Sequence, residues 1–124
     1  LPSMAPNCDQ RKCSTVAPQS LWFLNDLMLI DVAGQIGERV MSQTPGGAAA
    51  HVEQLYRRLF AAPPTERELQ ICLEFLEKQA IIFRADPDPA WQENIAKWPH
   101  APDLRALSSL CQALLSSNRF LYLD

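Results

Sequence analysis

The 124-residue sequence has little excess charge and no long apolar run. Its formal net charge is −3, from 14 acidic and 11 basic residues, and the basic residues are scattered rather than clustered. Nucleic-acid binding depends on a concentrated basic surface, so we expect no nucleic-acid partner. The apolar runs, such as 27–30, are far shorter than the roughly 20 residues that a transmembrane helix needs. We therefore expect no membrane span.

Cysteine is also scarce, with four residues in the chain, too few for a disulfide-built scaffold. Cys8 and Cys13 lack the paired spacing and nearby histidines of a structural zinc site. They form either a local disulfide, if the compartment is oxidising, or two free thiols. Cys72 and Cys111 fall within leucine-rich helical stripes, where a buried thiol packs as a small apolar side chain. A disulfide joining their two helices is the alternative.

The strong sequence signatures of enzymes are missing. There is no C-x-x-C-H, G-x-x-x-x-G-K-[ST], G-x-G-x-x-G, H-E-x-x-H or G-x-S-x-G motif. His51 and His100 are expected to be ordinary surface residues, and Asp86 and Asp88 to form a solvated turn rather than a calcium loop. We therefore assign no catalytic residue, no metal ligand and no cofactor-binding residue in this chain. The sequence favours the interpretation that the chain alone is not an enzyme.

Helical periodicity dominates the sequence, and no run shows the sustained alternation of a strand. Pro18 suits the first turn of a helix, so a first helix is expected from Pro18 to the SQTPGG segment. A second is expected over 48–60. The buried stripe expected along the first helix is Leu21, Leu24, Met28, Val32, Ile36 and Val40.

Capping signals predict two further helices. Thr65 and Glu68 form a capping box ahead of a third helix that begins at Glu66. Asp103 is expected to cap a fourth helix. Between them, 86–102 contains four prolines and is expected to be a loop with one short helical turn around 90–97.

The predicted architecture is therefore an all-α, four-helix bundle-like domain with a proline-rich loop between the third and fourth helices. Residues 1–17 are expected to form an extended entry segment, and 18–124 a single helical domain. The sequence begins LPSMAPN, with no export signal, and is expected to be part of a longer polypeptide. We expect the tryptophans, Trp22, Trp91 and Trp98, to pin the long loop to the core rather than to form an exposed platform for sugar or a partner.

Three segments of the sequence resemble a known family. They are APNCDQRKCSTVAPQSLWFLND, LYRRLFAAPPTERELQICLEFL and LSSLCQALLSSNRFLYLD, in that order. They resemble motifs of the C-terminal planctomycete-specific domain known as domain of unknown function 1553, and the chain resembles the C-terminal half of that domain. The matching residues are Ser14, Thr15, Val16, Pro18, Gln19, Leu21, Leu24, Asn25, Leu59, Pro64, Thr65, Glu68, Leu69, Leu114, Leu115, Asn118, Phe120, Leu121 and Tyr122.

The resemblance implies a cellular setting but no reaction. Such domains close large exported proteins of planctomycetes that often carry a signal peptide and a cytochrome c-type domain, which implies a periplasmic or extracellular location. Cys8 and Cys13 could then oxidise. A haem would belong to upstream domains absent from this chain, and the family has no agreed catalytic residues. Before the Pro-Thr pair the family often has Gly-Arg, whereas this chain has Ala61 and Ala62. Any role of that arginine in the family therefore cannot be assigned to this chain.

We interpret the first and third motifs as a structural clasp or interaction surface. In this interpretation Asn25, polar beside an apolar stripe, bonds the backbone of the incoming 8–15 segment. The residues assigned to the clasp are Arg11, Thr15, Pro18, Gln19, Asn25 and Asn118.

Three hypotheses for function follow. In the first, the chain is a non-catalytic packing and interaction module whose partners are other domains of its parent protein. In the second, it contributes to the active or carbohydrate-binding site of a secreted redox or polysaccharide-processing enzyme, through Asn25, Arg11 or the tryptophans. In the third and weakest, Cys8 and Cys13 form a thiol–disulfide switch.

Overall fold

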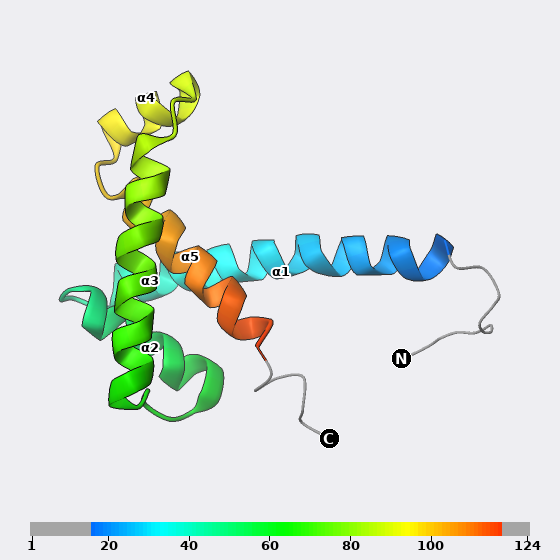
Figure 1. The fold of residues 1–124 in the computed structure, drawn as a ribbon, viewed down its shortest axis with the longest axis horizontal. Helices are drawn as coiled ribbons and strands as arrows, with labels where there is room; N and C mark the ends of the chain where they lie inside the picture. Colours follow the sequence, from blue (N-terminus) through cyan, green and yellow to red (C-terminus); the bar gives the residue numbers. More distant parts are fainter. Residues whose placement is uncertain (1–15, 118–124) are drawn as a thin grey trace. The chain divides into compact units, whose positions relative to one another are not determined.

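The structure is a computed structural model that describes residues 16–117, with side chains described from Asp26 onward. All regular elements in this range are helices (Figure 1). The predicted all-α class is therefore confirmed for the described residues. The helices are α1 (Val16–Gln43), α2 (Ala48–Phe60), α3 (Glu66–Ala85), α4 (Pro89–Lys97) and α5 (Ala101–Leu115).

The chain divides into two units within α1, after Asp31; the second unit contains the rest of α1 and all of α2 to α5. α1 begins at Val16, slightly before the start expected from Pro18. A proline is accommodated there because the first N–H groups of a helix have no partner within the helix. The predicted entry segment over 1–17 and helical domain over 18–124 stay predictions.

The predicted four-helix bundle with a proline-rich loop is not confirmed. The short helical turn expected around 90–97 lies at the right place but is a nine-residue helix, α4. Asp88 caps α4, and its side chain accepts a hydrogen bond from the Ala90 N–H at 3.2 Å. Pro89 occupies the first turn, where the missing N–H costs no hydrogen bond. Proline starts this helix, whereas the sequence pattern treats it as a break.

The start of α5 corrects a second expectation, that Asp103 is the capping residue. His100 is the N-cap residue and makes no side-chain capping hydrogen bond, and Pro102 lies in the first turn, where it is fully buried. Asp103 also lies in the first turn. Its negative charge is favourable there because unpaired N–H groups give the helix N-terminus a partial positive charge.

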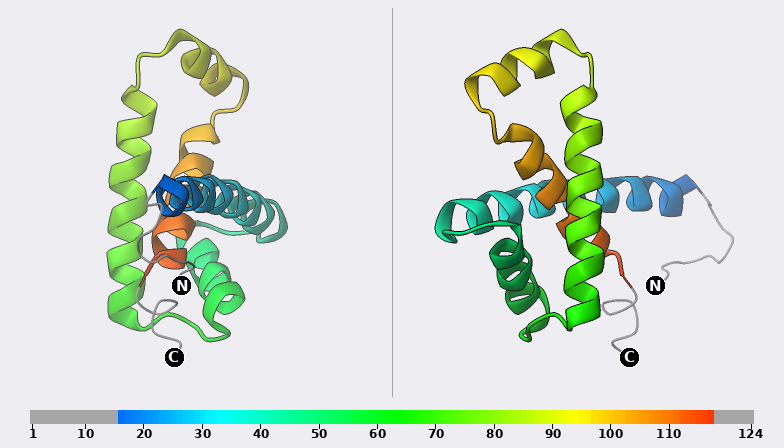
Figure 2. Two further views of the ribbon diagram at one scale, coloured as in Figure 1. Left: turned by 90° about the vertical axis from the view of Figure 1, so that its right-hand side faces the viewer. Right: turned by 60° about the vertical axis from the view of Figure 1, so that its left-hand side comes forward.

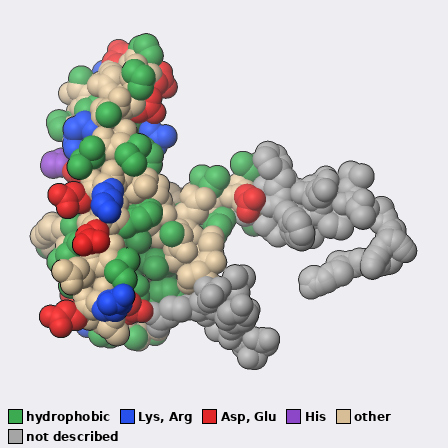
Figure 3. All heavy atoms as spheres, in the orientation of Figure 1, with side chains coloured by type: hydrophobic (Ala, Val, Ile, Leu, Met, Phe, Trp, Pro, Cys, Tyr) green, Lys and Arg blue, Asp and Glu red, His purple; other side chains and the backbone are tan. Residues whose placement is uncertain are grey.

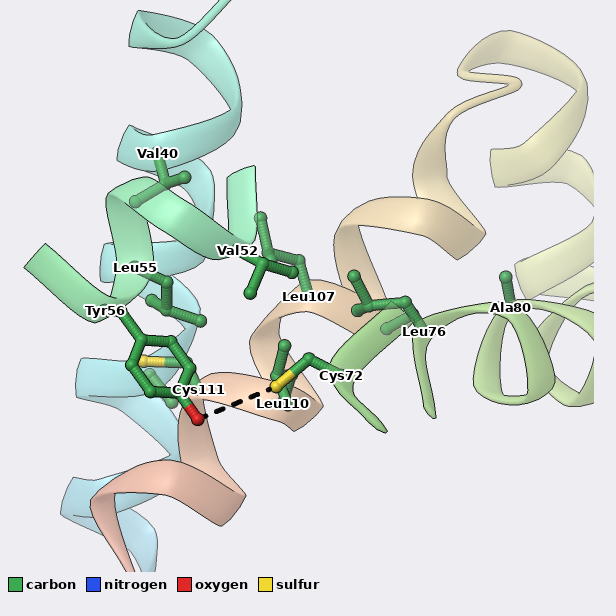
Figure 4. Close-up of a cluster of buried hydrophobic side chains, with 12 residues drawn as sticks. Val40, Val52, Leu55, Tyr56, Cys72, Leu76, Ala80, Leu107, Leu110 and Cys111 are labelled. Carbon is green, nitrogen blue, oxygen red and sulfur yellow. Dashed lines mark hydrogen bonds between the residues drawn. The ribbon is translucent and has the colours of Figure 1, made fainter. Parts of the chain in front are cut away.

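The core of the second unit is centred on α3 and α5, which share the most extensive interface among α2 to α5 (Figure 2). α2 packs against both helices and places Leu55 and Tyr56 over the contact (Figure 4). Burying a leucine-sized side chain stabilises a fold by about 1.5–3 kcal/mol, so this cluster is the main source of stability. The buried core residues are Ala33, Val40, Val52, Leu55, Tyr56, Cys72, Leu76, Ala80, Ala106, Leu107, Leu110 and Cys111.

The core-facing side of α1 consists of smaller residues than predicted. Met28 and Val32, both in the predicted stripe, are 64% and 43% exposed. Ala33 and Gly37 are buried instead, one turn apart, followed by Val40 as predicted. The predicted buried stripe is thus correct at Val40, near the end of α1. One turn and more before it, the buried residue is Ala33 rather than the predicted Val32.

Gly37 permits a close approach between α1 and α5. A Cβ added at Gly37 would lie 2.7 Å from Ser108 Oγ and 3.3 Å from the Ser108 Cα and N atoms. A Cβ at Gly34, in the preceding turn, would meet nothing within 4 Å. Only Gly37 is therefore required by packing.

α4 closes the C-terminal end of α3 through side-chain hydrogen bonds. Trp91 Nε1 donates to the Phe83 carbonyl oxygen at 2.5 Å. Gln92 Nε2 donates to the carbonyl oxygens of Arg84, at 3.0 Å, and Asp86, at 2.6 Å. The last carbonyl groups of a helix have no partner within it. α4 therefore adds donors at this end of α3, where the Phe83 carbonyl oxygen also accepts from the Asp86 N–H at 3.2 Å.

Arg105 of α5 completes this corner. Its guanidinium carbon lies 4.3 Å from the centroid of the Phe83 ring and 4.8 Å from that of Trp91, within cation–π range of both. Trp91 thus pins its segment to the core, as expected of the tryptophans. Trp98 does not, because it is 67% exposed.

The two ends of the α2–α3 connection differ in how well the sequence suits the backbone. The predicted capping box is confirmed: the Thr65 N–H donates to Glu68 Oε1 at 2.8 Å, and the Glu68 N–H donates to Thr65 Oγ1 at 3.1 Å. Ala61, which follows α2, has φ 58° and ψ 28°. This left-handed conformation favours glycine, the residue type that the family resemblance places there.

The contrast between Gly37 and Gly34 is testable. We expect Gly34→Ala to raise the free energy of unfolding by about 0.5–1 kcal/mol, because alanine is the better helix former and the added methyl group meets nothing. Gly37→Ala should lower it by about 1 kcal/mol, because the methyl group forces α1 and Ser108 apart. Urea unfolding of both variants measures the difference. Equal stabilisation by the two substitutions would contradict the close approach.

Candidate functional site

The residues predicted to form a clasp lie mostly beyond what the structure describes. Pro18, Gln19 and Asn25 belong to the first half of α1, but their side chains are not among those described. The clasp, the bond from Asn25 to the 8–15 segment and the Cys8–Cys13 disulfide therefore stay predictions. The predicted site residues outside the described range are Cys8, Arg11, Cys13, Thr15 and Asn118.

A cavity of about 860 Å³ lies between the α1–α2 connection, α3 and the beginning of α5. This volume falls within the range of about 300–1,000 Å³ that is typical of small-molecule sites. The floor is apolar and consists of core residues from two helices. Leu76 and Ala80 come from α3, and Ala106 and Leu107 from α5. The two alanines leave space that larger side chains would fill.

The α1–α2 connection forms one wall of the cavity, and His51 fixes its position. Gly46 and Gly47 line this wall, and Gly46 has φ 114°, a conformation that only glycine adopts without strain. His51 Nε2 lies 3.0 Å from the Thr44 carbonyl oxygen. Because a carbonyl oxygen only accepts, Nε2 carries the proton. The half-buried imidazole thus ties α2 to the end of α1.

Charged groups surround the opposite part of the rim. Arg84 lies 3.8 Å from Asp103, measured from Nη2 to Oδ1, and His100 Nδ1 lies 3.6 Å from Asp103 Oδ2. Both pairs are too long for hydrogen bonds and largely exposed, so each contributes little to stability. The arginine side chain is held near the cavity without using up its hydrogen-bond donors.

One face of α3 carries an ordered set of cavity residues. Glu77, Ala80, Ile81 and Arg84 all line the cavity, and their spacing of three, four and seven residues places them on the same side of the helix. This face therefore presents a carboxylate, an apolar middle and a guanidinium in succession. Figure 3 shows acidic, basic and hydrophobic side chains interspersed over the part of the surface that carries α3.

Sequence reasoning missed this cavity because its walls come from distant segments. The i, i+7 placement of Glu77 and Arg84 was readable from the sequence once α3 was predicted. The contribution of His51, expected to be an ordinary surface histidine, was not readable, since the Thr44 carbonyl group is positioned only by the fold. Asp86 and Asp88 form the junction of α3 and α4, where Asp86 Oδ1 accepts from the Asp88 N–H at 3.1 Å.

Cys72 and Cys111 are free thiols in the buried core, so the predicted packing role is confirmed and the alternative disulfide between their helices is not formed. The Cys72 thiol donates weakly to the Tyr56 hydroxyl oxygen at 3.9 Å (Figure 4). Burial raises the pKa of Cys72, partly offset by that hydrogen bond and reinforced by the negative charge of Glu68. Burial alone raises the pKa of Cys111 to about 11. Neither thiol is a nucleophile at neutral pH.

The buried Cys111 thiol should make stability fall at alkaline pH. An ordinary cysteine loses its proton near pH 8.5, so the unfolded chain releases this proton before the folded chain does. The stabilisation is complete below that pH and is lost as the pH rises towards 11. Between pH 8 and pH 10.5 we expect the free energy of unfolding of the native chain to fall by about 2 kcal/mol more than that of the Cys111→Ala variant. Urea unfolding at both pH values checks this, and parallel losses in the two proteins would contradict it.

Between residues 16 and 117 no three or more His, Cys, Asp or Glu side chains gather as they would around a metal ion. In the same part of the chain, no helix combines the length and the apolar character needed to cross a membrane.

Comparison with known proteins gives one match. The model of the PSD1 family, described as a protein of unknown function (DUF1553), matches residues 1–76. The match covers the first two motifs and reaches into α3, whereas the third motif lies outside it. No curated protein and no solved structure matched the chain. Because the matched region is more than half of the 124 residues, the chain belongs to the PSD1 (DUF1553) family.

Proposed function

We propose that this chain is a non-catalytic helical interaction module that packs against other parts of a larger exported protein. The observation that carries the proposal is a run of four apolar residues within α1. In this run, Leu27, Met28 and Ile30 are 47%, 64% and 50% exposed. Large side chains of this kind on a helix surface are typical of contact sites.

Helix geometry shows why these residues call for a partner. Successive residues of an α-helix are about 100° apart around its axis, so Leu27, Met28, Leu29 and Ile30 point in four directions. A helix that is apolar all round is stable when it is buried. No single flat surface covers all four side chains, so this part of α1 suits a groove formed by more than one neighbouring element.

α3 offers a further apolar surface in the second unit. Ile71, Ile81 and Ile82 are each more than half exposed. These isoleucines are poor choices for a helix surface in water, because β-branched side chains lose rotamer freedom in a helix and gain nothing from packing there. Their presence supports contact with other protein surfaces.

The family resemblance supplies the setting of the proposal. It implies a periplasmic or extracellular protein whose other domains include a cytochrome c-type domain, and a haem would be bound there rather than by this chain. The partners of the apolar surfaces would then be these other domains. The face shown in Figure 3 is compatible with this role, because acidic and basic side chains are interspersed on it.

One observation favours the second candidate function, a contribution to a carbohydrate-binding or active site. Trp98 exposes 67% of its surface, and an exposed indole ring provides a flat apolar face with a polar N–H group. Such a site also needs convergent polar groups around the ring. The interaction module has the broader support, since it accounts for the apolar residues of both α1 and α3.

The proposal is tested by binding in trans. The 124-residue chain and the remainder of the open reading frame that encodes it are produced separately, and their association is measured by calorimetry. The double variant Met28→Lys, Ile30→Lys should bind at least about tenfold more weakly, because each buried apolar contact of this size is worth more than 1 kcal/mol. The thermal midpoint of the isolated chain should stay nearly unchanged, since both side chains are exposed.

The control is Ser42→Lys with Ala49→Lys, which adds the same charge at two exposed positions outside the apolar run. This variant should bind as the native chain does. Absence of binding by the native chain, or equal weakening in both double variants, would remove the support for an interaction module built on α1.

A further inference from the structure

We propose that the cavity beside α3 binds a small dipolar molecule that has an amine at one end, a carboxylate at the other and an apolar body between them. This inference does not depend on the interaction role of α1, because the cavity is formed entirely by residues of the second unit. It rests on the order in which one helix face presents charge and apolar surface.

The spacing of the charges sets the dimensions of the ligand. Glu77 and Arg84 line the cavity and lie seven residues apart on α3, which corresponds to about 10 Å along the helix axis. Ala80 and Ile81 lie between them on the same face. A molecule with the opposite order of groups, cation, apolar chain and anion, matches this face along its whole length.

The carboxylate end of the ligand fits Arg84. A guanidinium group has five N–H donors arranged to bind a carboxylate through two hydrogen bonds. The contact between Arg84 and Asp103, at 3.8 Å, is an exposed ion pair of little strength. A ligand carboxylate can therefore join Arg84 without displacing Asp103. His100, which lies 3.6 Å from Asp103, balances the negative charge of that residue further when it is protonated.

The amine end fits Glu77. This carboxylate is exposed at the rim, two helical turns before Arg84, so an ammonium group near Glu77 lies away from the guanidinium. A simple carboxylic acid would leave Glu77 unmatched, and a simple amine would leave Arg84 unmatched. The dipolar ligand satisfies both charges at once.

The apolar body of the ligand fits the floor. Ala80 and Ala106 create the hollow, and Leu76 and Leu107 complete an apolar base beneath it. These four residues are already buried, so the apolar surface that an alkyl chain removes from water is mainly that of Ile81, which lines the cavity and is 60% exposed. This is favourable in proportion to the apolar area covered. The cavity therefore selects for a flexible or extended apolar chain rather than a compact polar molecule.

Three matched probes test the proposal on the full 124-residue chain. They are 8-aminooctanoate, octanoate and octylamine, which share an alkyl chain and differ in their charged ends. Titrations followed by amide resonances in NMR give both the affinity and the residues affected. We expect 8-aminooctanoate to bind about fivefold more tightly than either single-ended probe, the effect of one additional exposed charge pair, with shifts centred on the cavity residues of α3 and α5.

Substitutions at the two charges should act on opposite ends of the probe. Glu77→Gln should weaken binding of 8-aminooctanoate about fivefold and leave octanoate unchanged. Arg84→Gln should weaken the binding of 8-aminooctanoate by a similar factor and leave the binding of octylamine unchanged. Asp103→Asn is the control for Arg84, since it removes the same ion pair while keeping the guanidinium, and it should retain or strengthen binding. All three positions are on the surface, and the helical circular dichroism of each variant confirms that it is folded.

Three results would overturn the proposal. One is equal affinity of the three probes, which would mean that the alkyl chain alone is recognised. Another is a Glu77→Gln substitution that weakens the binding of octanoate as much as it weakens the binding of 8-aminooctanoate. The third is the absence of cavity shifts with any probe up to its solubility limit, which would show that the cavity does not take this class of molecule.

Discussion

The contact between α3 and α5 is the interaction on which the rest of the structure depends. The α3 residues buried in this core are Cys72, Leu76 and Ala80, and those of α5 are Ala106, Leu107, Leu110 and Cys111. α2 covers the contact with Leu55 and Tyr56. The end of α1 reaches α5 only because Gly37 has no side chain to meet Ser108. α4 secures the same pair at its other end, through hydrogen bonds to the last carbonyl groups of α3 and through Arg105 of α5. Within the second unit, α2, α4 and the end of α1 are therefore positioned by their contacts with this pair.

The same packing decides which surfaces remain for other molecules. Small residues at the α3–α5 contact, Ala80 and Ala106, leave a hollow that is bounded by charged residues at the rim. The outward isoleucines of α3 and the apolar run of α1 are not used by the described core. A chain of this size buries only about two-thirds of its unfolded surface, so some apolar exposure is expected. Four consecutive apolar residues that point in four directions exceed that expectation and support a role in protein contacts.

Local signals in the sequence were sufficient where one segment determines the outcome. The capping box at Thr65 and the burial of Cys72 and Cys111 follow from short patterns and are present in the structure. The predictions fell short where proline was read mainly as a break. The short helical turn expected around 90–97 is a full helix, α4, and α5 begins at Ala101 rather than after a cap at Asp103. The buried face near Val32 was also wrong, because a small-residue contact at Ala33 and Gly37 gives a weaker apolar signal than a row of large side chains. The cavity depends on three separate segments meeting, which no local pattern records.

Hydrogen exchange of the backbone amides tests the central claim most directly, since it reports the stability of each helix in one experiment. If the α3–α5 contact holds the second unit together, the slowest amides should lie in the parts of α3 and α5 that carry the buried core residues. They should share one free energy of opening, equal to that of global unfolding. α4 should exchange faster, because it lies at the edge and contributes no buried residue. Separate opening of α3 and α5, or exchange there as fast as in α4, would contradict the account.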